Sequence, residues 1–318
     1  MLFSFKDWNN FSYFFSASST QNFLKKNYIE LKIENPEQKS YENCYPFLYY
    51  LEHAQVYYEQ AAKSPLMIKP VLLFYGLVHL IKACILTTDP NYPETTAVLA
   101  HGVSTRKRKK QHYSFFQDEV KFQRSGLFPL MVDKMFHMKH LEGDKATMGD
   151  LLKQIPELSD LFTQFKGEET FLKISMQDSH YLIPKKILDS FHMTKNRFID
   201  FYQSRSAVQA SFIDREGDFF ELVLEMNPSY DPAPIKFNLR EGCYSLPLNK
   251  SQLFHFPELL IHYLLLYNLS MISRYETEWW SELIKMMPNQ DYPLIQSFLN
   301  ISIEKTPFLI YQFLNSKR

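Results

Sequence analysis

The segment that most constrains this chain covers residues 71–86 and is apolar on almost every side. It reads VLLFYGLVHLIKACIL and is followed by two proline-containing stops, DP and YP. A helix that is apolar all round has no face to offer to water, so it lies inside a larger helical assembly. The segment is also shorter than the roughly 20 residues that a membrane-spanning helix needs. We therefore expect a buried central helix in a protein that does not enter a membrane.

Two further helices can pack around this centre. A helix starting near Pro46 carries its apolar and aromatic residues on one face: Phe47, Tyr50, Leu51, Ala54, Tyr57, Tyr58 and Ala61. Residues 257–274 form a second largely apolar helix. Because both apolar helices need to leave water, we expect 71–86 and 257–274 to touch.

Shorter helical patterns occur elsewhere. Short helical pieces separated by proline and glycine are predicted within 127–164, and one further helix is predicted over 185–205. The C-terminal region is predicted to be helical from near Pro293 to near Lys317. A break is expected at Pro307, because proline lacks the backbone N–H that the helix interior requires.

Between residues 206 and 250 the pattern changes from helical to β-rich. Residues 208–226 predict two strands around the sequence REGD, where glycine suits the positive φ of a hairpin loop. The stretch PIKFNLREGCYSLPL supplies two more short strands. The predicted fold is therefore mainly α, an irregular helical bundle with a small β-hairpin-containing insertion. Its parts are a helical core over 1–205, the insertion over 206–250, and C-terminal helices over 251–318 that complete the core.

Composition limits the chemistry that the chain can carry. Only 8 of 318 residues are glycine, which disfavours the glycine-rich loops that cradle nucleotide phosphates. The 35 basic and 35 acidic residues balance, so any surface for nucleic acid must be local. The three cysteines lack the paired spacing of a zinc or redox site, and no metal or cofactor is expected. A reducing cytoplasm is the expected compartment.

Three polar residues interrupt the central apolar helix. Tyr75, His79 and Lys82 are spaced i, i+4 and i+7, which places them on one stripe. As a binding site, the stripe would use His79 to exchange a proton or contact an anion, with Lys82 supplying charge and Tyr75 a hydroxyl. In the structural alternative, which is the commoner outcome for such groups, the tyrosine and histidine make interhelical hydrogen bonds while the lysine extends to solvent.

The strongest local charge is a run of five cations after His101-Gly102. The run consists of Arg106, Lys107, Arg108, Lys109 and Lys110, and aromatic residues follow it. Adjacent cations neutralise phosphates and neighbouring rings stack on unpaired bases, so the segment, together with His101 before it, predicts a binding site for RNA or another polyanion. The alternative is a solvated charge run balanced by nearby carboxylates.

The segment SRYETEWW, residues 273–280, joins the second apolar helix to a short one. Arg274 can clamp a phosphate or carboxylate, and Trp279 or Trp280 can stack on a base. The structural alternative, favoured because tryptophan is mostly buried, is that this junction holds two helices at a fixed angle. Thr277 is the expected N-cap of the second helix.

Two blocks of sequence carry a resemblance to a known family. The first, over 71–129, contains LLFYGLVHLIKACIL, LAHGVSTRKRKKQHY and DEVKFQRSGLFP, and the second is SMISRYETEWWSELI over 270–284. They closely resemble the YaaC-like proteins of Gram-positive bacteria. With the N-terminal DWNNFSYFF, the likeness covers essentially the whole chain. The family brings no settled biochemical activity with it, so the resemblance implies membership and no particular reaction.

The helical topology and the Tyr-x-x-x-His-x-x-Lys stripe also resemble, at the level of the fold, the HEPN group of helical bundles. Many of those bundles are ribonucleases that carry an Arg and a downstream His with four to six residues between them. Here five residues separate Arg106 and His112, although Lys107 replaces the usual polar residue after the arginine. The resemblance implies metal-independent cleavage across a homodimer, with His112 as acid or base and Arg106 stabilising the phosphorane.

Three functions are therefore carried forward from the sequence. The leading one is a cytoplasmic binding protein whose basic segment engages RNA or another polyanion. The second is a metal-independent HEPN-type ribonuclease. The third is a protein-interaction scaffold that uses exposed aromatic residues near Trp279 and Tyr113.

Overall fold

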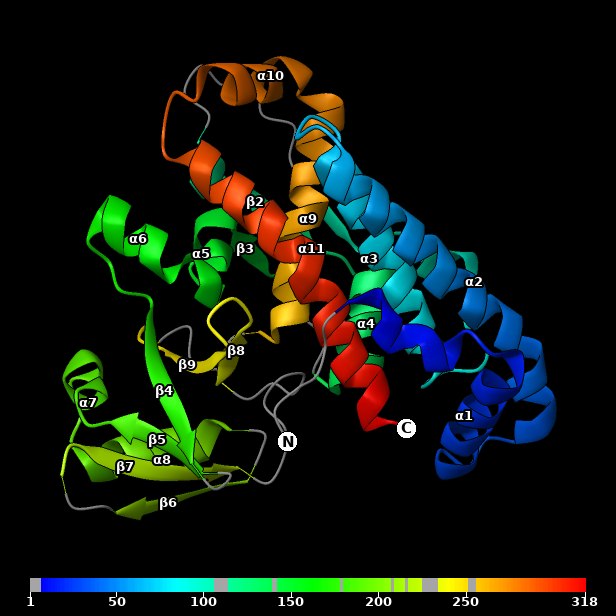
Figure 1. Cartoon of the computed structure of the whole chain (residues 1–318), viewed down its shortest axis with the longest axis horizontal. Helices are drawn as coiled ribbons and strands as arrows, with labels where there is room; N and C mark the ends of the chain where they lie inside the picture. Colours follow the sequence, from blue (N-terminus) through cyan, green and yellow to red (C-terminus); the bar gives the residue numbers. More distant parts are fainter. Residues whose placement is uncertain are drawn as a thin grey trace. The chain divides into compact units, whose positions relative to one another are not determined.

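The computed structural model describes residues 7–105, 114–138, 142–177, 180–206, 209–214, 217–224, 234–250 and 256–318 (Figure 1). The chain divides into two compact units. One combines Met1–Gly149 with His262–Arg318, and the other is Asp150–Ile261. The described fold is mainly α, as the sequence predicts, with two separate β-sheets.

The first unit is built from long helices around a buried centre. Its helical elements are η1 (Trp8–Phe14), α1 (Ala17–Glu30), α2 (Pro36–Lys63), α3 (Lys69–Leu86), η2 (Thr96–Leu99), η3 (Phe115–Gln117), α4 (Leu127–Phe136), α9 (Glu258–Tyr275, in this unit from His262), α10 (Thr277–Met286) and α11 (Asp291–Ser316). The central helix α3 packs against α2, α4 and α11 (Figure 1).

The predicted contact between the two apolar helices is confirmed. The ring of Phe74 on α3 lies 5.4 Å from that of Tyr263 and 5.6 Å from that of Tyr267, both on α9. Within the described residues, α3 is also long and apolar enough to cross a membrane, but 67% of it is buried inside the structure. Such burial is the ordinary condition of the core helix of a soluble protein.

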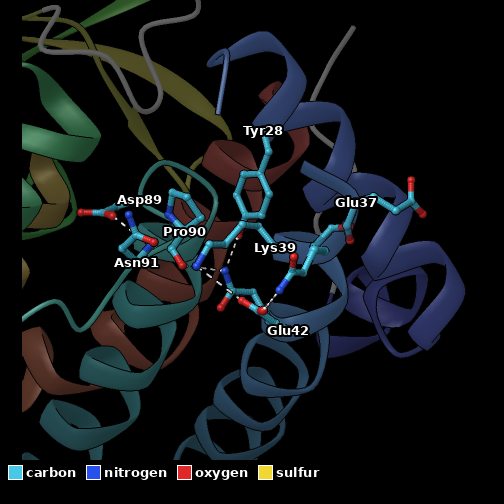
Figure 2. Close-up of polar contacts among 10 residues, drawn as sticks. Tyr28, Glu37, Lys39, Glu42, Asp89, Pro90 and Asn91 are labelled. Carbon is cyan, nitrogen blue, oxygen red and sulfur yellow. Dashed lines mark hydrogen bonds and ion pairs between the residues drawn. The ribbon is translucent and has the colours of Figure 1, made fainter. Parts of the chain in front are cut away.

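Buried hydrogen bonds fix the chain where it leaves α3. The hydroxyl of Tyr28 on α1 donates to the carbonyl of Leu86 over 2.8 Å. The amide of Asn43 on α2 donates to that hydroxyl and to the carbonyl of Pro90, both over 2.9 Å. Figure 2 shows these contacts around Tyr28 and Pro90. They tie the first two helices to the segment that follows the third.

Two prolines lie inside helices rather than at their ends. α2 begins at Pro36, not near Pro46, and α11 continues through Pro307, so the predicted start and the predicted break are both wrong. An interior proline costs about 3 kcal/mol, because it removes a backbone hydrogen bond and crowds the preceding turn. Around Pro307 this cost is offset by complete burial of neighbours such as Phe308 and Ile310.

A small sheet that the sequence did not predict completes the first unit. It has the order β1-β2-β3, with β1 at Val103–Thr105, β2 at Glu119–Phe122 and β3 at Lys145–Thr147, and both pairings are antiparallel. These strands are too short to show a reliable two-residue alternation.

The second unit contains a six-stranded antiparallel sheet of order β6-β7-β5-β4-β9-β8. Its strands are β4 (Phe171–Gln177), β5 (His180–Pro184), β6 (Ala210–Asp214), β7 (Phe219–Leu224), β8 (Lys236–Asn238) and β9 (Cys243–Pro247). The predicted hairpin, β6 with β7, and the predicted pair β8 with β9 are confirmed. β4 and β5 precede residue 206, so the β-rich part is larger than expected.

Short helices accompany this sheet. They are α5 (Met148–Leu152, shared with the first unit), η4 (Pro156–Leu158), α6 (Ser159–Lys166), α7 (Ile187–Phe191) and α8 (Lys195–Arg205). The single helix expected over 185–205 is therefore two, separated at His192, which has a φ of 51°. α8 packs on the sheet through Phe198, whose ring lies 6.2 Å from that of Phe212 and 5.8 Å from that of Phe220.

Candidate functional site

The polar stripe of α3 lies half-buried against α2. The ring of His79 is 5.6 Å from that of Tyr57 and nearly parallel to it, at 22°. It also lies 5.3 Å from the ring of His53 and 5.9 Å from that of Tyr50. Lys82 places its ammonium 5.6 Å from the centre of the Tyr50 ring. The stripe is therefore an aromatic and cationic surface shared by two helices.

His101 reaches the same surface from the loop before β1. Its ring lies 6.2 Å from that of Tyr75, 5.0 Å from that of Phe74 and 5.7 Å from that of Tyr267. Its carbonyl accepts hydrogen bonds from the hydroxyl of Tyr263 over 2.8 Å and from the backbone N–H of Phe128 over 3.1 Å. The backbone is thus held by α9 and α4, and the ring lies against α3 and α9.

A close approach of two glycines makes this position of His101 possible. Gly102 has a φ of 78°, and Gly126 has a φ of 127°. A Cβ on Gly126 would lie 2.4 Å from the backbone nitrogen of Gly102, and a Cβ on Gly102 would lie 2.4 Å from Cδ of Pro129. Only glycine fits at both places without moving the backbone.

Arg274, near the end of α9, extends over Tyr75. Its guanidinium carbon lies 5.9 Å from the centre of the Tyr75 ring and 5.1 Å from that of Tyr275. It donates to the carbonyl of Ser270 over 3.0 Å, to the sulfur of Met271 over 3.2 Å, and to the hydroxyl of Tyr75 over 3.5 Å. In the described part of the chain, no carboxylate forms an ion pair with this guanidinium.

We call this group the cation–aromatic cluster. It comprises Tyr75, His79, Lys82, His101 and Arg274 together with Tyr50, His53, Tyr57 and Tyr267. The first five are residues that the sequence singled out as binding candidates in three separate segments. The structure brings them onto one surface of the first unit.

Burial lowers the pKa of three basic side chains in the cluster. Burial lowers the pKa of His79 to about 4, and the neighbouring Lys82 and His53 make smaller contributions in the same direction. Burial, followed by Arg274 and Lys82, lowers the pKa of His101. Burial also lowers the pKa of Lys82. Burial first and the neighbouring cations second disfavour protonation, so the pKa of each imidazole lies below its ordinary value.

One ring nitrogen of His79 is left without a partner. Its Nδ1 atom is buried and, among the residues that the structure describes, has no hydrogen-bond partner. The structural alternative from the sequence, an interhelical hydrogen bond of this side chain, would use such an atom. A buried unpaired nitrogen costs about 1–3 kcal/mol, which favours a role beyond packing for this residue.

Four members of the cluster were not identified as site residues from the sequence. Tyr50 and Tyr57 were assigned to the core face of their helix, and His53 and Tyr267 were not singled out. The signal that could have found them is the spacing i, i+3 and i+7 of Tyr50, His53 and Tyr57, which forms a polar aromatic stripe matching that of α3.

The tryptophan pair is placed as the structural alternative expects. Trp280 is fully buried and donates its indole N–H to the carbonyl of Met67 over 3.0 Å. Trp279 is half-buried, with its ring 6.5 Å from that of Trp280 at 29°. α10 begins at Thr277, and Glu276 occupies the N-cap position, so the threonine is not the cap. The pair anchors the junction between α9 and α10.

The remaining candidates fall outside the described residues. Arg106, Lys107, Arg108, Lys109, Lys110 and His112 all lie within 106–113. β1 ends at Thr105, so the basic run follows that strand directly. Among the described residues, no group of three or more His, Cys, Asp or Glu side chains could hold a metal ion.

Comparison with known proteins identifies the family. Searches of the curated proteins and of the solved structures find no match to this chain. The family described as YaaC-like Protein matches residues 12–314, which is almost the whole sequence. The chain therefore belongs to the YaaC-like family.

Proposed function

We propose that this YaaC-like protein binds single-stranded RNA or a related polyanion. The observation that carries the proposal is the position of His101. This residue belongs to the cation–aromatic cluster, and the strand that follows it, β1, leads directly into Arg106 and the four cations after it. Cations that contact the phosphate backbone and aromatic rings on which bases stack are the two elements of single-strand binding.

The proposal includes features that rest on resemblance. A cytoplasmic location, a fold-level likeness to HEPN-type bundles and a homodimer are parts of it. Metal-independent cleavage by Arg106 and His112 is the catalytic extension of the same idea. It predicts a 2′,3′-cyclic phosphate product and loss of cleavage in both Arg106→Ala and His112→Ala.

A protein-interaction scaffold is the second candidate, and one observation favours it. Tyr41, Tyr45 and Tyr49 are spaced four residues apart on α2 and are 67%, 51% and 55% exposed. Exposed aromatic side chains on one helix face are typical of surfaces that bind other proteins. A stoichiometric protein partner that survives nuclease treatment and is lost when these tyrosines become serine would support this function instead.

The decisive experiment measures binding of a labelled single-stranded RNA across a salt series. In the test variant, Arg106 to Lys110 all become glutamine. The control variant removes the same charges from exposed positions elsewhere: Lys63, Lys121, Lys285, Arg197 and Arg240. Each lost phosphate contact reduces the slope of log K against log salt by about 0.7 for single strands.

We expect salt-sensitive binding in the wild type and the control variant, and weak binding with a shallow slope in the test variant. Equal loss in both variants would show a general charge effect rather than a site. The absence of binding even at low salt would reject the RNA proposal and the ribonuclease with it.

A further inference from the structure

The cation–aromatic cluster also has the features of a binding site for a small anion. We propose that the cation–aromatic cluster binds a phosphate monoester that carries a nucleobase, either the 5′-phosphorylated end of an RNA strand or a free nucleoside monophosphate. For the RNA end as ligand, this inference rests on the proposed RNA binding. For the free nucleoside monophosphate, it does not. The site consists of described residues and does not include the basic segment.

The first step is charge. Arg274 and Lys82 reach the cluster from different helices, and within the described residues neither makes an ion pair with a carboxylate. The ring of His101 lies 6.2 Å from that of Tyr75, the ring that Arg274 covers. An uncompensated pair of half-buried cations destabilises the free protein and is relieved when an anion binds. The cluster therefore has the electrostatics of an anion site.

The second step is the charge of the ligand. A phosphate monoester carries about −1.5 to −2 at pH 7, whereas each phosphate inside a strand carries a single charge. Two cations match a dianion better than a monoanion. Arginine can also form two parallel hydrogen bonds with a phosphate. A terminal monoester is therefore preferred over an internal diester.

The third step is the base. Half-buried rings of Tyr57 and Tyr75 lie side by side, with centroids 6.3 Å apart and planes at 28°. His79 stacks on Tyr57, and His53 next to it is exposed. Partly exposed, nearly parallel rings offer faces on which a base can stack, at about 1–3 kcal/mol per base. Phosphate and base are thus recognised by neighbouring parts of one surface.

The test compares two RNAs of the same sequence, one with a 5′-phosphate and one with a 5′-hydroxyl, by fluorescence anisotropy of a 3′ label. A parallel calorimetric arm compares AMP with adenosine. We expect the phosphorylated ligand of each pair to bind about tenfold more tightly, the effect of one charge-assisted hydrogen bond. Arg274→Gln should abolish this preference.

Two matched controls separate the site from general charge. Arg318 lies with its guanidinium carbon 3.7 Å from the centre of the Tyr13 ring, so Arg318→Gln also removes an arginine from a tyrosine face. Lys317 is half-buried, with a pKa lowered by burial and its ammonium 5.2 Å from the Phe313 ring centre, like Lys82 on Tyr50. Lys317→Met is therefore the control for Lys82→Met, which should weaken the preference. Thermal melts confirm that each variant is folded.

The outcomes distinguish this inference from the proposed function. RNA binding that is independent of the 5′ end, together with no difference between AMP and adenosine, overturns the inference and leaves RNA binding in place. Binding of AMP over adenosine without any RNA binding rejects the proposed function and supports the free mononucleotide as ligand. A preference that persists in Arg274→Gln and in Lys82→Met overturns the assignment to this cluster.

Discussion

The buried hydrogen bonds around Tyr28 and Asn43 give a quantitative test of how α1 and α2 hold the end of α3. Asn43→Leu removes two donors, one to the Tyr28 hydroxyl and one to the carbonyl of Pro90. Each buried bond contributes about 1 kcal/mol, and a buried carbonyl left without a partner adds about 1–3 kcal/mol. We therefore expect the substitution to lower the free energy of unfolding by about 3 kcal/mol.

Tyr28→Phe removes the bond to Leu86 and the acceptor for Asn43, but leaves the amide bonded to Pro90. Its expected cost is about 2 kcal/mol. Because the two side chains share a bond, the double variant should cost about 1 kcal/mol less than the sum of the single variants. This double-mutant cycle thus isolates the hydrogen bond between Tyr28 on α1 and Asn43 on α2.

The assay is denaturant unfolding followed by circular dichroism, with thermal melts in parallel. For a unit of this size, 1 kcal/mol corresponds to about 2–4 °C in Tm, so Asn43→Leu should lower Tm by about 6–12 °C. Gln55→Leu is the control, since it removes an exposed side-chain bond to Glu59 on the same helix and should stay within about 0.5 kcal/mol of wild type. A loss for Asn43→Leu no larger than that of the control, or strict additivity in the cycle, would refute the reasoning.

Three other predictions concern single residues. In an NMR titration, the His79 ring should show a midpoint near its pKa of about 4, and Lys82→Met should raise that midpoint while leaving it below 6.5, because burial is the larger cause. Since the folded protein holds this imidazole neutral, its contribution to stability is complete above pH 6.5 and is lost as pH falls toward 4. Gly126→Ala should destabilise the fold by at least about 2 kcal/mol in a thermal melt and shift the His101 resonances, because its Cβ would meet a backbone nitrogen at 2.4 Å. Trp280→Phe should cost about 2 kcal/mol through its lost hydrogen bond, whereas Trp279→Phe should cost less than half as much.

The sequence predicted the helical centre well because its signals there are long and redundant. The segment 71–86 is apolar on nearly all sides, and only a buried position satisfies such a helix. The contact of α3 with α9 follows from the same requirement. Spacing along one helix likewise predicted that Tyr75, His79 and Lys82 share a stripe, because that inference needs no tertiary information.

Other features depend on tertiary packing and could not be predicted. Nothing local shows that Arg274 reaches Tyr75, a residue 199 positions away, since that contact depends on how α9 crosses α3. The predictions made at the two prolines are wrong for the same reason. The local cost at Pro46 and Pro307 argues for helix boundaries, but burial of neighbouring side chains along two long helices outweighs it. The short strands β1 to β3 carry too few residues for a two-residue pattern.

A stability measurement on Lys82 can separate a binding role from a packing role without any ligand. Burial lowers the pKa of this lysine, and its charge in turn lowers the pKa of His79, so the cation is unfavourable where it lies. Lys82→Met keeps the hydrophobic stem and removes the charge, and we expect it to raise Tm by about 1–3 °C. Lys317→Met should gain less, because the charge of Glu30 partly offsets the burial of that lysine. A residue whose removal stabilises the free protein is retained for function rather than folding. If Lys82→Met instead lowers Tm by several degrees, the ammonium stabilises the fold, and the argument for an anion site at the cluster loses its electrostatic basis.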